Sequence, residues 1–198
     1  DGQKTISSFN FQEYEKLDFL KYEGPTDPTI TGSFGNILTY KNLKLNVFVT
    51  YSFGNVIRLD PVFSNAYSDL DAMPKEFKNR WMKAGDENVT NIPTIVSTRM
   101  NQQYAYLNMA YNAYNYSDVR IADGGFIRLK EISLSYDLPA KVINFFRLNK
   151  LQLKLQATNL CLLYADSKLN GQDPEFFRSG GVSTPVPKQF TFTVRLGL

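Results

Sequence analysis

The sequence predicts an all-β fold in which antiparallel strands form part of a transmembrane β-barrel, and three observations support this prediction. First, apolar and polar residues alternate with a period of two in several segments, which is typical of strands with two different faces. Second, Phe (15 residues) and Tyr (12 residues) far outnumber the single Trp, and such rings favour strands. Third, short and long links alternate between the segments, as they do in transmembrane barrels.

The clearest alternation runs over residues 43–53 and returns over residues 189–198. Because successive side chains of a strand point to opposite faces, each segment has one continuous apolar face. In the first segment this face comprises Leu43, Leu45, Val47, Val49, Tyr51 and Phe53. In the last segment it comprises Phe190, Phe192, Val194, Leu196 and Leu198.

Three further strands are expected where the alternation is less complete. In residues 151–158, Leu and Ala alternate with Gln, Lys and Thr. In residues 126–138 the alternation changes phase near Lys130 and Glu131, which predicts a β-bulge there. A weaker strand over residues 33–40 completes the set.

Alternation alone leaves two folds open. In a soluble β-sandwich the apolar face covers a core and the polar face meets water. In a transmembrane barrel the apolar face meets lipid, the polar face lines a lumen, and each strand needs roughly 9–11 residues to cross.

The lengths of the links favour the barrel. Lys41 and Asn42 form a two-residue turn, and a compact link with a short helical piece at residues 142–146 follows Pro139. The links after residues 53 and 162 are long, about 70 and about 25 residues. If the last strand ends in the periplasm, every short turn lies on that side and every long loop lies outside. Rings suited to membrane interfaces lie near the expected strand ends: Tyr40, Tyr51, Phe53, Tyr136, Phe190 and Phe192.

Five strands are too few to close a barrel, which needs about eight. Open strand edges in lipid would leave backbone groups without hydrogen bonds. The rest of the barrel is therefore expected from upstream sequence, another segment or other subunits. No charged and then apolar segment opens the chain, so no signal peptide is expected and Asp1 is interpreted as the start of a fragment or a processed end.

Composition argues against several other functions. The chain has no His and a single Cys161, which disfavours zinc sites and an internal disulfide. The net charge of +3 is spread along the chain without a Lys/Arg block, so no nucleic-acid partner is expected. No run of about 18 apolar residues predicts a membrane-spanning helix. The acidic residues are too scattered to nominate a glycosidase pair, so we expect neither an enzyme nor a cofactor.

Several motifs resemble a known family. Residues 125–139, GFIRLKEISLSYDLP, are similar to a segment near the C-terminus of SusC/RagA-type TonB-dependent outer-membrane transporters. Residues 151–160, the GQDPE motif at 171–175 and residues 185–192 resemble that family's next strand, loop and terminal strand. Upstream, residues 32–36, residues 40–42, and Arg80-Trp81 with Gly85-Asp86 also resemble family motifs in the same order. The likeness covers about residues 25–198, and Ala84 and Leu198 depart from it.

This resemblance implies an antiparallel barrel of about 22 strands, of which this chain supplies the C-terminal strands and long extracellular loops, with a plug domain that the chain itself lacks. The expected division is residues 1–32 as a loop or preceding strand, 33–54 as a hairpin, 55–123 as an extracellular loop, 124–162 as a hairpin with a periplasmic turn, 163–186 as an extracellular loop and 187–198 as the terminal strand.

The function implied by the resemblance is TonB-energised import of oligosaccharides or peptides through the outer membrane of a Gram-negative cell. The implied partners are the remainder of the barrel and the plug, a SusD-like surface lipoprotein that acts as a lid, TonB acting through the N-terminal part, and membrane lipid. The alternative from the residues alone is a soluble β-sandwich carbohydrate-binding module.

Candidate cargo contacts lie in the first long loop. In residues 69–84 apolar residues recur at helical spacing up to Trp81, and a local packing face is the preferred interpretation. Residues 102–116 are rich in rings and amides, which suit the apolar faces and hydroxyl groups of sugars or the backbone of extended peptides. For any single Tyr, packing within the loop or on the lid is the preferred alternative. The candidates are Trp81, Tyr104, Tyr106, Tyr111, Tyr114, Tyr116 and Asn112.

Charged residues suggest two further sites. Lys44, Lys154 and Arg195 are expected to face the lumen, where they would favour anions or, as the plainer interpretation, form ion pairs or contact the plug. Asp166, Asp173 and Glu175 suggest calcium ligands, but their spacing matches no trusted loop. Solvated carboxylates are the preferred interpretation, and no metal is expected.

Overall fold

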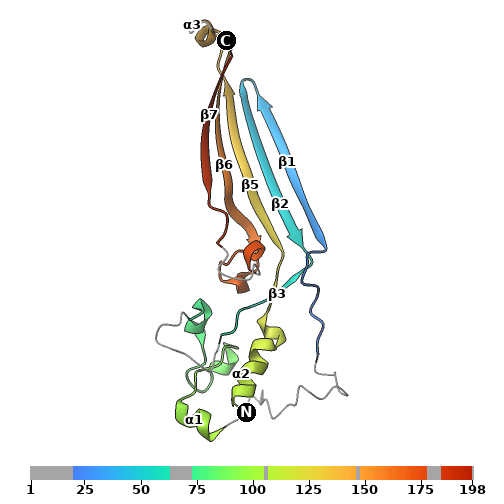
Figure 1. The fold of residues 1–198 in the computed structure, drawn as a ribbon, viewed down its shortest axis with the longest axis vertical. Coiled ribbons are helices and arrows are strands. Elements are labelled where there is room, and N and C mark those ends of the chain that lie inside the picture. Colours follow the sequence, from blue (N-terminus) through green and yellow to red (C-terminus); the bar gives the residue numbers. More distant parts are fainter. Residues whose placement is uncertain (1–19, 63–72, 105–106, 146–147, 178–183, 198) are drawn as a thin grey trace. The chain divides into compact units, whose positions relative to one another are not determined.

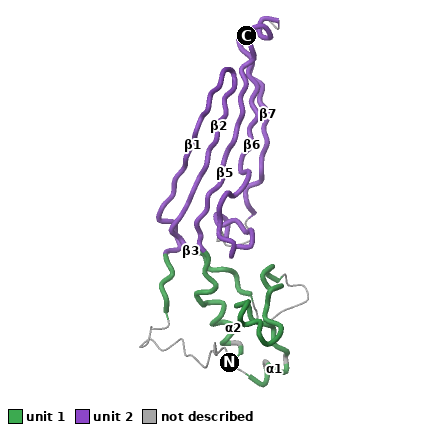
Figure 2. Tube along the Cα trace, turned by 180° about the vertical axis from the view of Figure 1, so that it is seen from behind, with its two compact units in different colours: residues 1–24, 57–122 green, residues 25–56, 123–198 purple. Residues whose placement is uncertain are grey.

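The computed structural model describes residues 20–62, 73–104, 107–145, 148–177 and 184–197. The chain divides into two compact units, which Figure 2 shows in different colours. Unit 1 comprises residues 1–24 and 57–122, and unit 2 comprises residues 25–56 and 123–198.

Unit 2 is built on one five-stranded antiparallel sheet (Figure 1). Its strands, in spatial order, are β1 (Ile30–Tyr40), β2 (Leu43–Phe53), β5 (Phe126–Asp137), β6 (Lys150–Ala165) and β7 (Gln189–Gly197). Each of these strands pairs with the one that follows it along the chain, so the sheet is an antiparallel meander. The predicted all-β fold class is confirmed.

The phase change in β5 is the predicted bulge. Glu131 pairs with Phe48 and Leu129 pairs with Val49, so Lys130 is the additional residue of the bulged strand. The bulge returns Leu129 to the face that carries Ile132, because their partners Val49 and Val47 share one face of β2.

Strand β6 extends further than the alternation predicts. The clear alternation ends at residue 158 and the expected hairpin ends at residue 162, but β6 continues to Ala165. Asn159 has φ 54°, a left-handed conformation that shifts the register between the Thr158 and Cys161 pairings. Because residues 160–163 are apolar at both parities, the alternation seemed to stop while the strand continued.

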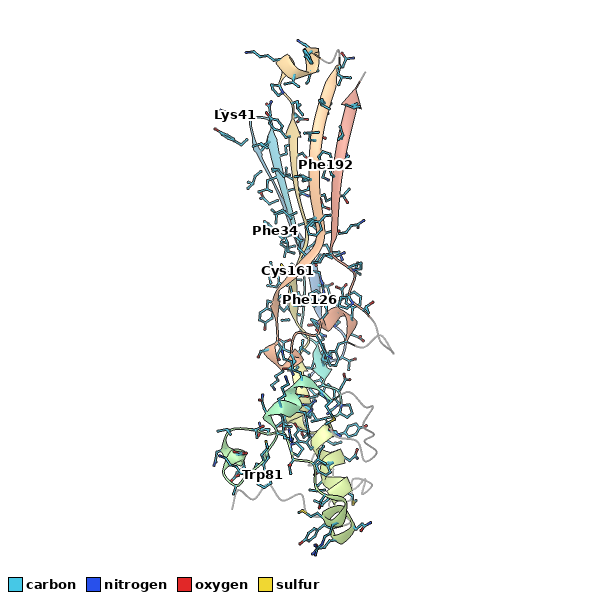
Figure 3. All side chains as sticks on the ribbon, turned by 90° about the vertical axis from the view of Figure 1, so that its left-hand side faces the viewer. Phe34, Lys41, Trp81, Phe126, Cys161 and Phe192 are labelled. Carbon is cyan, nitrogen blue, oxygen red and sulfur yellow. The ribbon has the colours of Figure 1, made fainter. Side chains whose placement is uncertain are left out.

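One face of the sheet is apolar on every strand and lacks a covering layer. Leu45, Leu134, Leu155 and Phe192 pair in register across four strands. Leu155 is 58% exposed and Phe192 is 61% exposed, and Figure 3 shows Phe34 and Phe192 among the side chains of this sheet. In the described part of unit 2 no second sheet packs against this face. The sandwich alternative requires such a layer, so the structure argues against it.

Links of different length lie at opposite ends of the unit 2 sheet. The turn at Lys41-Asn42 and the link with α3 (Ala140–Phe145) lie at the end where β7 finishes (Figure 1). The N–H of Asn149 donates to the carbonyl of Gly197 at this same end. Residues 166–177, which follow β6, lie at the other end. The sequence predicts this arrangement for the strands of unit 2, with short turns at one end of the sheet and a long link at the other.

Unit 1 consists of short helices with a small core. Its elements are η1 (Lys75–Asn79), η2 (Asp86–Asn88), α1 (Thr98–Gln103), α2 (Leu107–Tyr116) and η3 (Asp118–Arg120). The strands β3 (Val56–Arg58) and β4 (Ile121–Asp123) pair with each other. Buried apolar side chains of this unit include Ile57, Leu59, Val62, Phe77, Tyr111 and Ala122. No helix in the described ranges is long and apolar enough to cross a membrane.

The helix suggested by the apolar spacing of residues 69–84 is wrong for the described part of that range. Only the short 3-10 helix η1 forms, between Pro74 and Arg80. The residue before a proline is disfavoured in the helical region, and Arg80 is already extended at ψ 156°. Leu70 lies outside the described residues.

Candidate functional site: the polar face of the sheet

The side of the unit 2 sheet opposite its apolar face is termed the polar face. Four side chains of the sheet are buried, namely Ser52, Arg128, Ser133 and Gln152, and all four lie on this face. A water-soluble sheet normally buries its apolar face, so the arrangement is inverted. The polar face carries Lys44, Asn46, Thr50, Ser52, Arg128, Glu131, Ser133, Ser135, Asp137, Gln152, Lys154, Gln156, Thr158, Thr193 and Arg195.

A hydrogen-bonded row crosses three strands near the end with the short turns. Arg195 Nη1 donates to Gln152 Oε1 at 3.5 Å, and Gln152 Nε2 donates to Asp137 Oδ1 at 2.9 Å. The amide of Gln152 therefore links the guanidinium of β7 to the carboxylate of β5. The structure places the predicted residue Arg195 on the polar face, within this row.

A second row centres on the carboxylate of Glu131. Asn46 Nδ2 donates to Glu131 Oε1 at 3.2 Å, and Lys154 Nζ lies 3.9 Å from the same oxygen. Lys44 pairs with Ser135, which pairs with Lys154, so both predicted lysines lie in one cross-strand row. Lys154 thus follows the ion-pair interpretation, whereas no described carboxylate forms an ion pair with Lys44.

A third cluster ties the segment after β6 to the polar face. The segment comprises residues 166–177, with η4 (Ser167–Leu169) and η5 (Pro174–Phe176). Arg128 Nη2 donates to both carboxylate oxygens of Asp173, at 2.5 and 2.6 Å, and lies 3.1 Å from Glu175 Oε2. The side chains of Arg128 and Asp173 are only 6% and 9% exposed. We term Arg128, Asp173 and Glu175 the anchor cluster.

The same geometry corrects the expectation for these acidic side chains. Asp173 is buried and paired instead of solvated, because it bonds Arg128 and also accepts the N–H of Glu175 at 3.1 Å. Asp166 accepts the N–H groups of Asp123 and Lys168, at 2.8 and 2.9 Å. No group of three or more metal-binding side chains occurs among the residues that the structure describes.

Arg128 was not singled out by the sequence reasoning. Its motif and the GQDPE motif at 171–175 are far apart in the sequence, and Asp173 lies 45 residues after Arg128. The signal in the sequence is that Arg128 stands on a strand between two apolar residues, Ile127 and Leu129. If the Arg128 side chain is buried, its charge requires an acidic partner.

Charges on the polar face and in the anchor cluster nearly balance. The cations are Lys44, Arg128, Lys150, Lys154 and Arg195, and the anions are Glu131, Asp137, Asp173 and Glu175. A nearly balanced set of charges does not produce a broad positive field. The structure therefore supports the ion-pair interpretation over a preference for anions.

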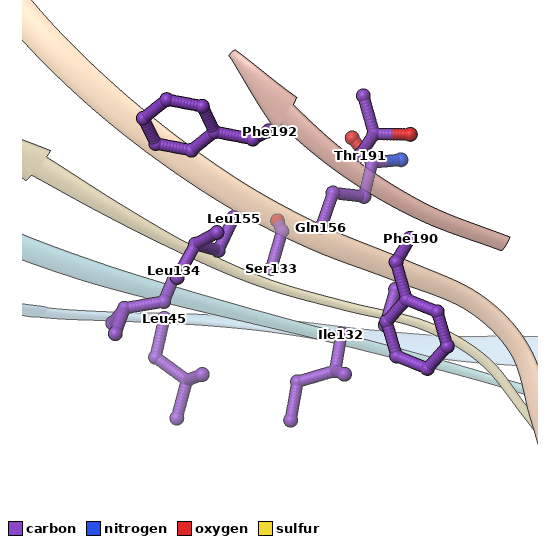
Figure 4. A pocket seen from close by; sticks show the side chains of 10 residues that line it. Leu45, Ile132, Ser133, Leu134, Leu155, Gln156, Phe190, Thr191 and Phe192 are labelled. Atoms are coloured by element: carbon purple, nitrogen blue, oxygen red, sulfur yellow. The ribbon is translucent and has the colours of Figure 1, made fainter. Parts of the chain in front are cut away.

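A hollow of about 520 Å³ lies on the other side of the sheet (Figure 4). Side chains of Leu45, Ile132, Leu134, Leu155, Phe190 and Phe192 line it, Ser133, Gln156 and Thr191 are also among its lining residues, and no charged group is. Most of its lining belongs to the uncovered apolar face. We therefore do not assign the expected cargo to this hollow.

In unit 1, two of the predicted tyrosines serve packing. Tyr111 is buried and its hydroxyl donates to the carbonyl of Thr94 at 2.6 Å. The ring of Tyr114 lies 5.7 Å from the guanidinium carbon of Arg120, and burial raises the pKa of the Tyr114 hydroxyl. Arg120 is itself buried, 2.8 Å from Glu76 Oε1 and 2.5 Å from the carbonyl of Asp60.

The other predicted side chains of unit 1 are accessible. Tyr104 and Tyr116 are 38% and 68% exposed, and Asn112 is also exposed. Asn112 and Tyr116 are four residues apart on α2 and therefore share one side of that helix. Tyr106 lies outside the described residues.

Trp81 is held by a carboxylate of the same loop. Its Nε1 donates to Glu87 Oε2 at 3.1 Å, and this bond lowers the pKa of Glu87. Trp81 is partly exposed.

Comparison with known proteins gives a consistent result. No family model matches the chain. TonB-dependent receptor P3 of Formosa agariphila is 27% identical over 155 residues, which cover 78% of this chain and 14% of the relative. The chain thus spans only a small part of the relative's length.

Solved structures show the same likeness in three dimensions. The RagAB peptide importer in its "open-open" state matches with a TM-score of 0.60 and 21% identity, over 90% of this chain and 18% of the solved chain. A second RagAB peptide transporter structure matches with a TM-score of 0.61 and 22% identity, over 88% of this chain and 18% of the solved chain. These comparisons confirm the resemblance to SusC/RagA-type TonB-dependent transporters, and they show that the antiparallel strands have the fold of part of such a barrel.

Proposed function

We propose that this chain forms part of the barrel of a TonB-energised importer in the outer membrane of a Gram-negative cell. The observation that carries the proposal is the inverted sheet of unit 2, with an uncovered apolar face and a polar face that carries the four buried side chains of the sheet. Lipid on the apolar side and a lumen on the polar side satisfy both faces. The homologues, TonB-dependent receptors and RagAB transporters, are integral outer-membrane proteins.

The remainder of the barrel and a plug are the first partners in this proposal. Strands β1 and β7 are the outer strands of the sheet, and within the described residues each pairs with a strand on one side only. In lipid such edges need hydrogen-bond partners, which further strands of a barrel of about 22 would supply. TonB is the further proposed partner and would act through the N-terminal part of the transporter.

The proposed cargo is a peptide or an oligosaccharide, captured with the help of a SusD-like surface lipoprotein. Two solved relatives carry the names peptide importer and peptide transporter, and RagAB pairs a transporter with a SusD-like protein. Within unit 1, the exposed rings and amide of Trp81, Tyr104, Tyr116 and Asn112 are the proposed cargo contacts. Tyr111 and Tyr114 are omitted because they serve packing. Lys44, Lys154 and Arg195 remain the proposed lumen-facing charges.

Membrane fractionation of cells that make the full-length protein tests the location. The protein should occur in the outer-membrane fraction, require detergent for extraction, and migrate differently in a gel before and after boiling. Recovery from the aqueous fraction without detergent would contradict the proposal.

Uptake measurements test the cargo contacts. We expect the double variant Asn112→Ala/Tyr116→Ala to lower uptake of labelled peptides or oligosaccharides at limiting concentration. The matched control is Met109→Ala, because Met109 is exposed on the same helix but lacks a ring or amide. Equal uptake by the double variant and the control would remove these residues from the site.

A further inference from the structure

We propose that Arg128 is a positioning residue that holds residues 166–177 against the polar face of the sheet. This segment, instead of bare strands, would then line the cargo path at the end of the sheet where β6 finishes. The statement about the cargo path rests on the proposed function, whereas the statement about the segment rests on the geometry of unit 2 alone.

Arg128 is placed where a single side chain can reach the segment. It lies on the central strand β5, where its pairing partners are Thr50 of β2 and Leu162 of β6. Its guanidinium is on the polar face and almost completely buried. A buried guanidinium requires a partner, and the carboxylates of Asp173 and Glu175 supply it.

Asp173 connects this charge to the backbone of the segment. While both of its oxygens accept from Arg128, Oδ1 also accepts the N–H of Glu175 and so caps η5. The turn of η5 is therefore attached to β5 through Arg128, in addition to its own internal hydrogen bonds. The contacts of Arg128 with the carboxylates of Asp173 and Glu175 use its single nitrogen Nη2, which lies between the two carboxylates.

The segment has the internal order needed to move as one piece. Asp166 caps η4, and Asn170 and Gly171 close the following turn with φ 53° and 87°. Gln172 donates its N–H to the carbonyl of Leu169 at 2.9 Å, and Leu169 is 1% exposed. Release of the anchor cluster should therefore expose Leu169 along with the rest of the segment.

The anchor cluster also leaves one acidic side chain accessible. One guanidinium faces two carboxylates, and the side chain of Glu175 is 42% exposed. If the segment lines the path, Glu175 presents this excess negative charge there.

Cysteine labelling of the full-length protein tests the inference. Cys161 is exposed, so the background is Cys161→Ser, and Leu169→Cys provides a buried reporter. With Arg128 intact, an impermeant maleimide should react slowly. With Arg128→Gln, the reaction should accelerate by about tenfold or more, because the buried carboxylates lose their partner.

Two further variants separate an anchoring role from a general loss of structure. Arg195→Gln removes another cation of the polar face whose bond goes to Gln152, so labelling should stay slow. The exchange Arg128→Asp with Asp173→Arg should restore slow labelling at least partly. If Arg128→Gln does not reach the membrane, Asp173→Asn with Glu175→Gln takes its place and the same acceleration is expected.

The outcomes distinguish the two proposals. Slow labelling of a correctly inserted Arg128→Gln protein, or fast labelling with Arg128 intact, would overturn the inference and leave the proposed function standing. Absence of the parent protein from the outer membrane would overturn the proposed function. Fast labelling with Arg128→Gln, reversed by the exchange, supports the anchoring role.

Discussion

Two arginine side chains, Arg120 in unit 1 and Arg128 in unit 2, are buried together with carboxylates. Moving charges out of water costs free energy that a partner only offsets, so such a pair contributes little net stability compared with apolar residues. Removing one partner is different, because an uncompensated charge remains inside the protein. Each arginine is therefore a position where a single substitution should have a large effect.

The substitution Arg120→Met should destabilise unit 1 by about 3–5 kcal/mol, because it leaves Glu76 sheltered without its partner. The measurement is hydrogen exchange of α2 in the full-length protein. The double variant Arg120→Met/Glu76→Met, which removes both charges, should protect α2 better than the single one. Equal exchange in the wild type and in Arg120→Met would show that the pair is energetically unimportant.

Tyr114 should make unit 1 sensitive to high pH. Its folded pKa is raised, chiefly by burial, above the ordinary value of about 10. Between the unfolded and the folded pKa, the phenol loses its proton only in the unfolded state, so stability is complete below about pH 10 and decreases as the pH rises further. The pH at which an alkaline-active protease begins to cut residues 57–122 should therefore be higher for Tyr114→Phe. An unchanged threshold would contradict this explanation.

Strand β6 depends on a left-handed residue in its middle. Asn159 has φ 54°, a conformation that Asn and Gly tolerate and that β-branched residues disfavour. We expect Asn159→Val to lower the temperature at which the folded protein converts to its unfolded gel form, at a cost of about 1–2 kcal/mol. Asn159→Gly should be close to neutral, and Thr158→Val, one residue earlier, is the control with ordinary strand geometry. Identical melting of all three variants would show that the bulge is not under this constraint.

The bulge at Asn159 also shows where the strands could not be predicted from the sequence. Alternation identifies strands wherever it is uninterrupted, and β2 has the predicted bounds of 43–53. The bulge at Lys130 was predictable because apolar residues resume in the opposite phase after it. The bulge at Asn159 was not, since the residues that follow, Leu160, Cys161, Leu162 and Leu163, are apolar at both parities.

The sites were predictable to a different extent. The polar face follows from alternation, so Lys44, Lys154 and Arg195 could be assigned to it. The anchor cluster could not, because it joins segments far apart in sequence through one hydrogen-bonded side chain. Tyr111 and Tyr114 could not be separated from Tyr104 and Tyr116 either, since burial within unit 1 depends on tertiary packing.

For the molecule as a whole, the decisive question is which medium surrounds the apolar face of unit 2. Substitutions at Leu155 and Gln156 can test this, because these neighbouring residues lie on opposite faces of β6. Leu155 joins the row of Leu45, Leu134 and Phe192, whereas Gln156 pairs with Ser133 and Thr191.

In lipid, a Lys at the middle of a barrel's outer surface costs about 2–4 kcal/mol, whereas lumen positions accept charge. We therefore expect Leu155→Lys to lower both the yield of folded protein in the outer membrane and its resistance to heat, as measured by gel migration before and after heating. Gln156→Lys is the matched control, since it places the same charge one residue away on the polar face, and it should keep both properties. If Leu155→Lys were tolerated as well as Gln156→Lys, the apolar face would be in contact with water, and the barrel assignment would have to be abandoned.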